Sequence, residues 1–284
     1  MIRKASAFRN SADYTEKHEC TPIADSQKIR RYMDYPKFES LIEDKALFFS
    51  RIDKFSDIYE GKWARTNLES KVFVSDTRRG SEEYNEDRRI LHASVKDILR
   101  LIYVTCFTIQ EYESERMWTE YTKSPMSVAI ESDFSRLKQS FTKYTGDNRV
   151  FTEIYASKIR YLENENENMD EWSALFPIIY KRKEYEYEKE LRLFTTYSGI
   201  DLAIRQIRIE DLKKSGKKSI AEYLELGILP DYPALIISID PKILISNVVI
   251  HPEADVAFLR SVERLLKHNS ISITPLMSSI KKIR

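Results

Sequence analysis

The chain has 284 residues, of which 42% are hydrophobic and 32% are charged. This length and apolar content suffice for the core of one large domain. Its 46 basic and 45 acidic side chains leave a formal charge of +1, so bulk charge gives no reason to expect binding to nucleic acid or to an anionic membrane.

The sequence lacks the signatures of several common protein classes. Residues 1–17 are polar and basic, without the apolar segment of a secretory signal, and the longest apolar runs are too short to span a bilayer. Cys20 and Cys106 form no CxxC pair, which disfavours a disulfide framework or a zinc site. The scattered glycines form neither a dinucleotide-binding fingerprint nor a P-loop. We therefore expect a soluble, cytoplasmic protein without a metal or a membrane partner.

Polar segments indicate one domain with an arm and an insertion. Residues 1–21 are predicted to be a flexible arm, and residues 22–284 a single domain. Within this domain, residues 64–100 are largely polar and charged and are predicted to contain a helical insertion. The acidic, repetitive residues 163–171 are typical of a solvated loop.

A strand, a helix and a second strand are predicted near the N-terminus. Lys28–Met33 has strand composition, and Asp34-Tyr35-Pro36 follows as the start of a helix, because Asp is a common cap and Pro is tolerated in the first turn. Phe38, Leu41 and Ile42 give this helix one apolar stripe. Ala46–Ile52 is predicted to be the next strand.

The rest of the chain alternates between strand and helix patterns. Further strands are predicted at Tyr103–Thr108, Ser127–Ile130, Val150–Tyr161, Ala203–Ile209, Ala234–Ile239, Ser246–Ile250 and Ile271–Thr274. Helices are predicted at 95–101, 115–121 (a helix or a turn), 134–141, 171–182 and 258–266. Because strands outnumber clean βαβ units, the predicted fold class is α+β, with a mixed, largely antiparallel sheet flanked by helices.

The segment Tyr187–Phe194 is predicted to be a strand with an unusual charged face. Because successive side chains alternate along a strand, Glu188, Glu190 and Arg192 would share one side of the sheet. Charged groups on a sheet are costly to bury unless they are paired or used. Two interpretations fit: an exposed face with cross-strand ion pairs, or a functional site.

Several of these segments, taken in order, resemble a bacterial family catalogued only as a domain of unknown function. The matching motifs are Arg31-Tyr32, Phe49-Ser50, Phe55–Glu60, Cys106-Phe107, Met117-Trp118 with Tyr121, Tyr187-Glu188 with Glu190 and Arg192, and the strand, His-Pro turn and helix of Val249–Lys267. The resemblance covers Lys28–Thr274. Ser56 and Ile58 depart from the family pattern, and the family brings no assigned chemistry.

The order of Arg31, Ser50 and the pair Glu188/Glu190 is also similar to that of ADP-ribosyltransferases of the Arg–Ser–Glu type. In that class a strand with Arg, a helix, a strand with Ser and a later strand with Glu-x-Glu hold NAD without a glycine-rich loop. The resemblance implies an ADP-ribosyltransferase-like fold, NAD as a substrate, and an ADP-ribosyltransferase or NAD glycohydrolase activity. The acceptor would be a protein or a nucleic acid.

The resemblance also implies roles for the matching residues. Glu190 would stabilise the oxocarbenium-like cation that forms when the nicotinamide–ribose bond breaks. Glu188 would orient or deprotonate the acceptor. Arg31 would clamp a pyrophosphate oxygen, and Ser50 would fix the Glu or the ribose. The remaining residues expected to bind NAD are Tyr32, Trp118, Tyr121 and Arg192; Trp118 and Tyr121 would stack on a ring of NAD. Arg31, Ser50 and Glu190 would then border one cleft.

Two other functions stay open. The first is a non-catalytic module that binds a nucleotide, a small molecule or a partner protein, for example in a bacterial stress or phage-defence system. Its short basic clusters, such as Lys181–Lys183, are more typical of a solvated face. The second is a metal-dependent nuclease that uses Glu188, Glu190 and Asp57, although an Arg two residues after the second acid fits that pattern poorly.

Overall fold

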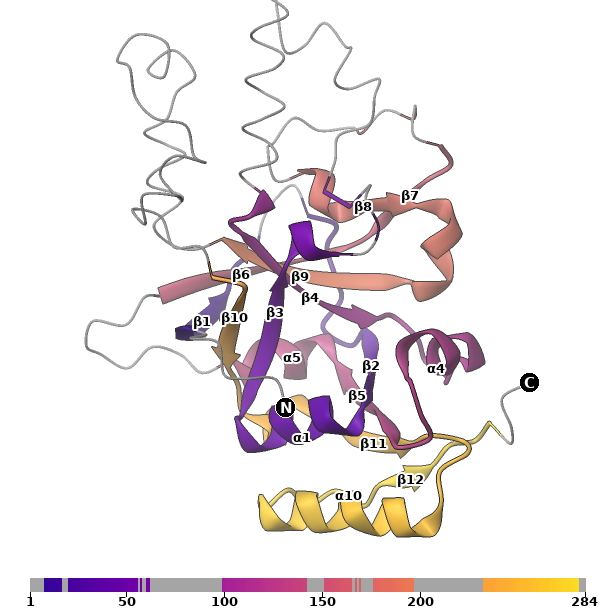
Figure 1. Ribbon diagram of the computed structural model, residues 1–284. Helices are drawn as coiled ribbons and strands as arrows, with labels where there is room; N and C mark the ends of the chain where they lie inside the picture. The colour runs from indigo at the N-terminus through magenta and orange to yellow at the C-terminus, as the bar shows by residue number, and fades with distance from the viewer. Residues whose placement is uncertain are drawn as a thin grey trace, which may run out of the picture.

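The computed structural model describes residues 8–16, 20–55, 57, 60–61, 99–141, 151–164, 167, 169, 176–196 and 232–280 (Figure 1). The strands are β1 (Phe8–Tyr14), β2 (Lys28–Asp34), β3 (Ala46–Arg51), β4 (Ile102–Thr108), β5 (Ser127–Asp133), β6 (Phe151–Lys158), β7 (Arg160–Leu162), β8 (Tyr180–Arg182), β9 (Glu190–Thr196), β10 (Ala234–Ser238), β11 (Asn247–Ile250) and β12 (Leu276–Met277). The helices are α1 (Tyr35–Glu43), α4 (Glu115–Tyr121), α5 (Phe134–Ser140), α9 (Pro241–Leu244) and α10 (Val256–His268). Three short 3-10 helices are η1 (Ile52–Lys54), η3 (Phe176–Ile179) and η4 (Lys183–Glu188).

The strands form a mixed, largely antiparallel sheet, which confirms the predicted α+β fold class. Its strand order is β12-β11-β5-β2-β4-β3-β10-β1-β6-β9, and β4 also pairs with β9. Strands β4, β3, β10, β1, β6 and β9 therefore close into a ring, from which β2, β5, β11 and β12 extend. Figure 1 shows α1 and α10 at one end of the molecule, and β7 and β8 at the other.

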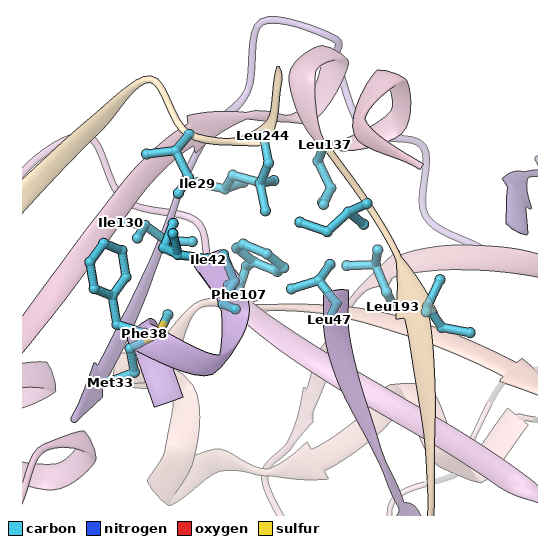
Figure 2. Packing of buried hydrophobic residues seen from close by; sticks show 14 of the residues in the cluster. Ile29, Met33, Phe38, Ile42, Leu47, Phe107, Ile130, Leu137, Leu193 and Leu244 are labelled. Carbon is cyan, nitrogen blue, oxygen red and sulfur yellow. The ribbon is translucent and has the colours of Figure 1, made fainter. Parts of the chain in front are cut away.

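The main hydrophobic core takes side chains from one face of the ring strands and from β2, β5 and β11 (Figure 2). Leu47, Phe107 and Leu193 lie in this core beside residues of α1 and α5. Because side chains alternate along a strand, the opposite face of β4 and β9 is directed away from it. A second cluster, which includes Val104 and Phe194, covers part of that opposite face together with residues of η3 and β8.

The strand–helix–strand unit predicted near the N-terminus is confirmed as β2, α1 and β3. The predicted stripe of α1 is buried. Asp34 precedes the helix, but its side chain does not cap it. Instead, its carboxylate accepts hydrogen bonds from the Lys123 backbone N–H at 2.8 Å and from the Ser127 hydroxyl at 3.1 Å. Asp34 thus joins the start of α1 to the start of β5.

Strands β2 and β3 meet the same edge of β4 at different points. Strand β2 pairs with β4 through Arg30 and Thr108, and β3 pairs through Ser50 with Val104 and Arg51 with Tyr103. Strand β9 pairs with the other edge along the whole of β4. In the described part of the chain, residues 105–107 have no strand partner on the first edge. Strands β2 and β3 therefore diverge there.

Two predictions near the ends of the chain are wrong. Phe8–Tyr14, expected in a flexible arm, forms β1, which pairs in parallel with both β10 and β6. The segment is polar, and its strand structure comes from its two neighbours. The strand predicted at Ile271–Thr274 is irregular, and the short β12 follows at Leu276–Met277. Ile271 packs into the main core directly after α10. Its N–H donates to the Leu266 carbonyl of that helix at 2.9 Å and not to a neighbouring strand.

The helix predicted at 171–182 is also wrong in its described part. Residues 176–182 form η3 and β8 instead. Pro177 lacks the N–H group that a continuing α-helix requires. Most of the predicted insertion at 64–100 and the strand predicted at Ala203–Ile209 lie outside the described residues. Across the residues that the structure covers, no helix has the length and apolar character needed to cross a membrane.

Candidate functional site

Glu188 and Glu190 do not share a strand as predicted. Glu188 ends η4, Lys189 follows with a left-handed backbone (φ 43°), and β9 begins at Glu190. The turn is held against β4, because the Thr108 hydroxyl donates to the Glu188 carbonyl and the Ile109 N–H donates to the Lys189 carbonyl. Glu188 is therefore displaced from the strand face, yet its carboxylate reaches the same cluster as that of Glu190.

This cluster is a buried ionic network around Arg192 and Lys181. Arg192 is 0% exposed; its Nε donates to Glu190 Oε1 and its Nη1 to Glu60 Oε2, both at 2.7 Å. Lys181 Nζ lies 2.6 Å from Glu188 Oε2, 3.3 Å from Glu190 Oε2 and 3.4 Å from Glu60 Oε1. Three carboxylates thus share two cations. The ion pairs expected on an exposed face are instead buried.

The network separates the pKa values of the two neighbouring carboxyls. Burial alone would raise the pKa of Glu190, but Arg192, Lys181 and a hydrogen bond from Cys106 outweigh burial and lower that pKa to about 2. Burial raises the pKa of Glu188, and Lys181 and Tyr121 only partly oppose this effect. Paired carboxyls with divergent pKa values suit different roles in one reaction. Glu190 is a permanent anion at neutral pH, and Glu188 binds a proton more readily.

Two tyrosines border these carboxyls. The Tyr161 hydroxyl accepts a hydrogen bond of 2.8 Å from the Glu190 backbone N–H. The Tyr121 phenol, carried on α4, is hydrogen-bonded to Glu188; burial and the Glu188 charge both raise the pKa of Tyr121. Because Tyr121 remains 40% exposed, it connects the buried network with the surface. The structure thus places the predicted residue Tyr121 at Glu188.

Trp118 and Tyr32, both expected to bind NAD, pack against each other. Trp118 is 0% exposed, and the two rings meet edge to face with centroids 4.8 Å apart. The indole N–H donates to Glu113 at 3.2 Å, and the Tyr32 hydroxyl accepts from the Ser114 N–H at 3.0 Å. Both rings therefore hold α4 against β2, and neither is hydrogen-bonded to Glu188 or Glu190 in the described part of the chain.

Arg31 lies where β2 leaves the edge of β4. Alternation along β2 directs it to the side of the main core, where its guanidinium carbon is 5.6 Å from the Phe107 ring centroid. Burial lowers the pKa of Arg31. In the described part of the chain, Arg31 forms no hydrogen bond or ion pair. Among the described residues it is therefore a cation without an acidic partner.

Cys106 is the residue that Arg31 and Glu190 have in common. Its thiol is hydrogen-bonded to Glu190, and only its ionised form would raise the pKa of Arg31. Burial, followed by the Glu190 charge, raises the pKa of Cys106 well above its usual value, so the thiol stays protonated. Arg31 and Glu190 leave their strands on opposite sides of the sheet, and the Cys106 side chain is on the side of Glu190.

Ser50 lies on the same face of the sheet as Glu190 but at a different position along β4. It pairs with Val104, whereas Glu190 pairs with Thr108. Four residues along a strand correspond to roughly 13 Å, too far for a direct hydrogen bond. The structure therefore brings Glu188, Glu190, Arg192 and Tyr121 together, places Arg31 on the other side of the sheet, and leaves Ser50, Tyr32 and Trp118 outside this group. The single cleft expected between Arg31, Ser50 and Glu190 is therefore wrong.

Two members of the network, and the tyrosine Tyr161 beside it, were not predicted from the sequence. Glu60 was visible only as the last residue of the Phe55–Glu60 motif, and its pairing with Arg192 spans a long sequence separation. Lys181 belonged to a basic cluster expected at the surface, but its side chain is 8% exposed. Tyr161 gave no signal. Within the described residues, no group of three His, Cys, Asp or Glu side chains is arranged to hold a metal. Asp57, which the metal-dependent nuclease would use together with Glu188 and Glu190, forms an ion pair of 3.2 Å with Arg182.

The lowered pKa of Glu190 predicts a loss of stability in acid. The carboxyl has an ordinary pKa of 4.5 and a folded value of about 2. Its stabilising contribution is therefore present above the unfolded pKa and is lost as the pH falls through the folded one. Between about pH 5 and pH 2, we expect the free energy of unfolding of the wild type to fall by about 3 kcal/mol more than that of Glu190→Gln. Urea titrations of both proteins at several pH values measure this difference. If the free energies of unfolding of the two proteins differed by the same amount at every pH, the pKa of Glu190 would not be lowered in the folded state.

Comparison with known proteins gives little further information. No protein-family model matches the chain, and no curated protein matches it. Thermus sp. 2.9 DarT in complex with carba-NAD+ is similar with a TM-score of 0.31 and 10% identity, covering 91% of this chain and 97% of that one. The same protein in complex with ADP-ribosylated ssDNA gives a TM-score of 0.31 and 9% identity, covering 92% of this chain and 98% of the other. Similarity at this level identifies neither a family nor an activity.

Proposed function

We propose that this chain cleaves NAD, as an ADP-ribosyltransferase or an NAD glycohydrolase, where β2, β4 and β9 meet. The observation that carries the proposal is that Arg31, a cation without an acidic partner among the described residues, and Glu190, a permanent anion, both lie within electrostatic range of Cys106. A dinucleotide that loses nicotinamide needs both groups: a cation for its pyrophosphate and an anion for the ribose cation.

The proposed reaction divides the work between the two carboxyls. When the bond between ribose C1′ and nicotinamide breaks, its electron pair leaves with nicotinamide and positive charge develops on the ribose. The Glu190 carboxylate stabilises this charge more in the transition state than in the ground state. A nucleophile then bonds to C1′, and Glu188, whose pKa is raised, takes the proton that the nucleophile loses. Water as the nucleophile gives hydrolysis; a protein or nucleic-acid group gives transfer.

Arg31 provides the test of substrate binding. Replacing it with Met is expected to weaken NAD binding about 10- to 100-fold, because a charge-assisted hydrogen bond to the pyrophosphate contributes about 1.5–3 kcal/mol. Calorimetry in a Glu190→Gln background measures the affinity without consuming NAD. Arg264→Met is the matched control, since Arg264 is on the exposed side of α10 and, among the described residues, donates a hydrogen bond to the Ser261 hydroxyl. Equal affinity in the Arg31 and Arg264 variants would argue against the pyrophosphate role.

A non-catalytic binding module is the second candidate, and the ionic network itself favours it. Glu188 and Glu190 are both buried, and each already has a cation partner. Carboxylates satisfied in this way also serve a purely structural purpose. This candidate predicts nucleotide binding that depends on Arg31, without any release of nicotinamide.

A further inference from the structure

We propose that Glu113 is a positioning residue for the carboxyl network: it fixes α4 in the orientation that brings Tyr121 to Glu188. As a role in the reaction, this inference rests on the function proposed above. Glu113 directly precedes Ser114, the N-cap residue of α4, and the helix has only seven residues. A helix of this length is not stable without contacts to the rest of the protein. The position of Tyr121, its last residue, therefore depends on what holds the helix.

The Glu113 carboxylate joins α4 to the C-terminal segment of the described chain. Its Oε2 accepts from the Trp118 indole N–H of α4 at 3.2 Å and from the Ser278 hydroxyl. Its Oε1 accepts from the Ser279 backbone N–H at 2.8 Å and from the Ser279 hydroxyl at 2.9 Å. Burial would raise the pKa of Glu113, but these four bonds outweigh burial and lower that pKa. The carboxylate is therefore ionised at neutral pH, and its hydrogen bonds are of the stronger, charge-assisted kind.

The bond to Trp118 fixes the rotation of α4 about its own axis. The Trp118 ring is buried in a third hydrophobic cluster, against which Ile280 of the C-terminal segment also packs. Trp118 and Tyr121 are three residues apart, so they are neighbours on the surface of the helix. An indole that is held by both Glu113 and this cluster thus sets the direction in which Tyr121 leaves the helix.

Helix α4 meets the Glu188 turn at two points. The Tyr121 phenol donates to Glu188, and the Arg116 guanidinium carbon lies 3.4 Å from the centroid of the Tyr187 ring. A displaced α4 would withdraw the phenol from Glu188. The ion pair of Glu188 with Lys181, at 2.6 Å, does not involve α4 and would remain.

The expected consequence is a higher pKa of Glu188. The bond from Tyr121 lowers that pKa, so its loss raises it. In the proposed reaction Glu188 must be ionised to take a proton, and a higher pKa therefore moves the acid limb of the pH–rate profile to higher pH. The other titratable groups that act on or respond to Glu188 come from β7, β8, η4 and β9 and are unchanged: Tyr161, Lys181, Tyr187 and Glu190.

Glu113→Gln in the full chain tests the proposal with two measurements. In hydrogen–deuterium exchange, we expect the amides of α4 to exchange at least about tenfold faster than in the wild type, with those of α1 unchanged. In the pH dependence of kcat/KM for nicotinamide release, we expect the acid limb to lie about one pH unit higher. Tyr121→Phe, which removes the hydroxyl, should shift the limb equally. The double variant should shift it no further, because both changes act through one hydrogen bond.

The matched control is Glu111→Gln, since Glu111 is two residues earlier and its side chain is exposed; its exchange and pH profile should be those of the wild type. Ser278→Ala combined with Ser279→Ala is a second variant, which keeps the Glu113 carboxylate but removes two of its four donors. It should also speed up the exchange of α4.

Wild-type exchange of α4 in both Glu113→Gln and the serine variant would overturn the proposal. Acid-limb shifts that add up in the double variant with Tyr121→Phe would overturn it as well, because Glu113 would then not act through Tyr121. A wild-type chain that releases no nicotinamide would refute the proposed function alone. The exchange of α4 would in that case still decide whether Glu113 positions the helix.

Discussion

Replacement of Arg192 by Met should lower the free energy of unfolding by about 3–5 kcal/mol, because it leaves buried carboxylates without their cation. Arg192 bonds Glu190 and Glu60 at 2.7 Å each and donates to the Ile178 carbonyl at 2.6 Å. Lys181 would remain as the cation for three carboxylates. Urea denaturation at neutral pH measures the loss.

The matched control for Arg192 is Lys183→Met. Lys183 also contacts two carboxylates, Glu163 and Glu186, but all three side chains are exposed. Solvent and salt screen such pairs, so we expect no measurable change in stability. Similar losses in the two variants would show that burial does not determine the importance of the Arg192 network. Adding Glu190→Gln to Arg192→Met should restore part of the lost stability, because it removes one unpaired charge.

Replacement of Glu190 by Gln should reduce the rate of nicotinamide release about 100- to 1,000-fold. The amide keeps the size of the side chain but removes the charge that would stabilise the ribose cation, and the loss of one preorganised electrostatic group typically has an effect of this size. Because Gln can still accept a hydrogen bond from Arg192, much of the local packing should persist. High-performance liquid chromatography of released nicotinamide measures the rate.

Glu186→Gln separates this effect from a general loss of an acid. Glu186 lies in η4, four residues before Glu190, but its side chain is exposed and contacts Lys183. We expect it to release nicotinamide at the wild-type rate. Circular dichroism of both variants tests whether they remain folded. Equal rates in Glu190→Gln and in the wild type would remove Glu190 from the reaction, even if NAD cleavage itself were observed.

The parts of the fold that the sequence predicted have local patterns. The stripe of Phe38, Leu41 and Ile42 identified α1, and the corresponding stripe of α10 is also buried. Strand β1 has no such pattern. Its strand structure depends on pairing with β10 and β6, which are far away in the chain, and so it was not predicted. The predicted helix at 171–182 failed for a local reason: Pro177 stands inside it.

The prediction of the site was limited in the same way. Alternation along a strand correctly put Glu190 and Arg192 on one face. It did not reveal how far along β4 each residue lies, so Ser50 was expected beside Glu190 and is instead four pairs away. Nor did it reveal burial, because Lys181 and Glu60 meet Arg192 and Glu190 only in the folded chain.

The most direct test of NAD cleavage is a time course of nicotinamide release from NAD by the purified wild-type chain. It should be run alone, with single-stranded DNA, and with cell lysate as a source of acceptors. The proposed function predicts continuous release in at least one of these mixtures, at a rate that Glu190→Gln does not reach. No release in any of them would contradict NAD cleavage, and the network of Glu60, Glu188 and Glu190 with Lys181 and Arg192 would then be a structural element of a binding module.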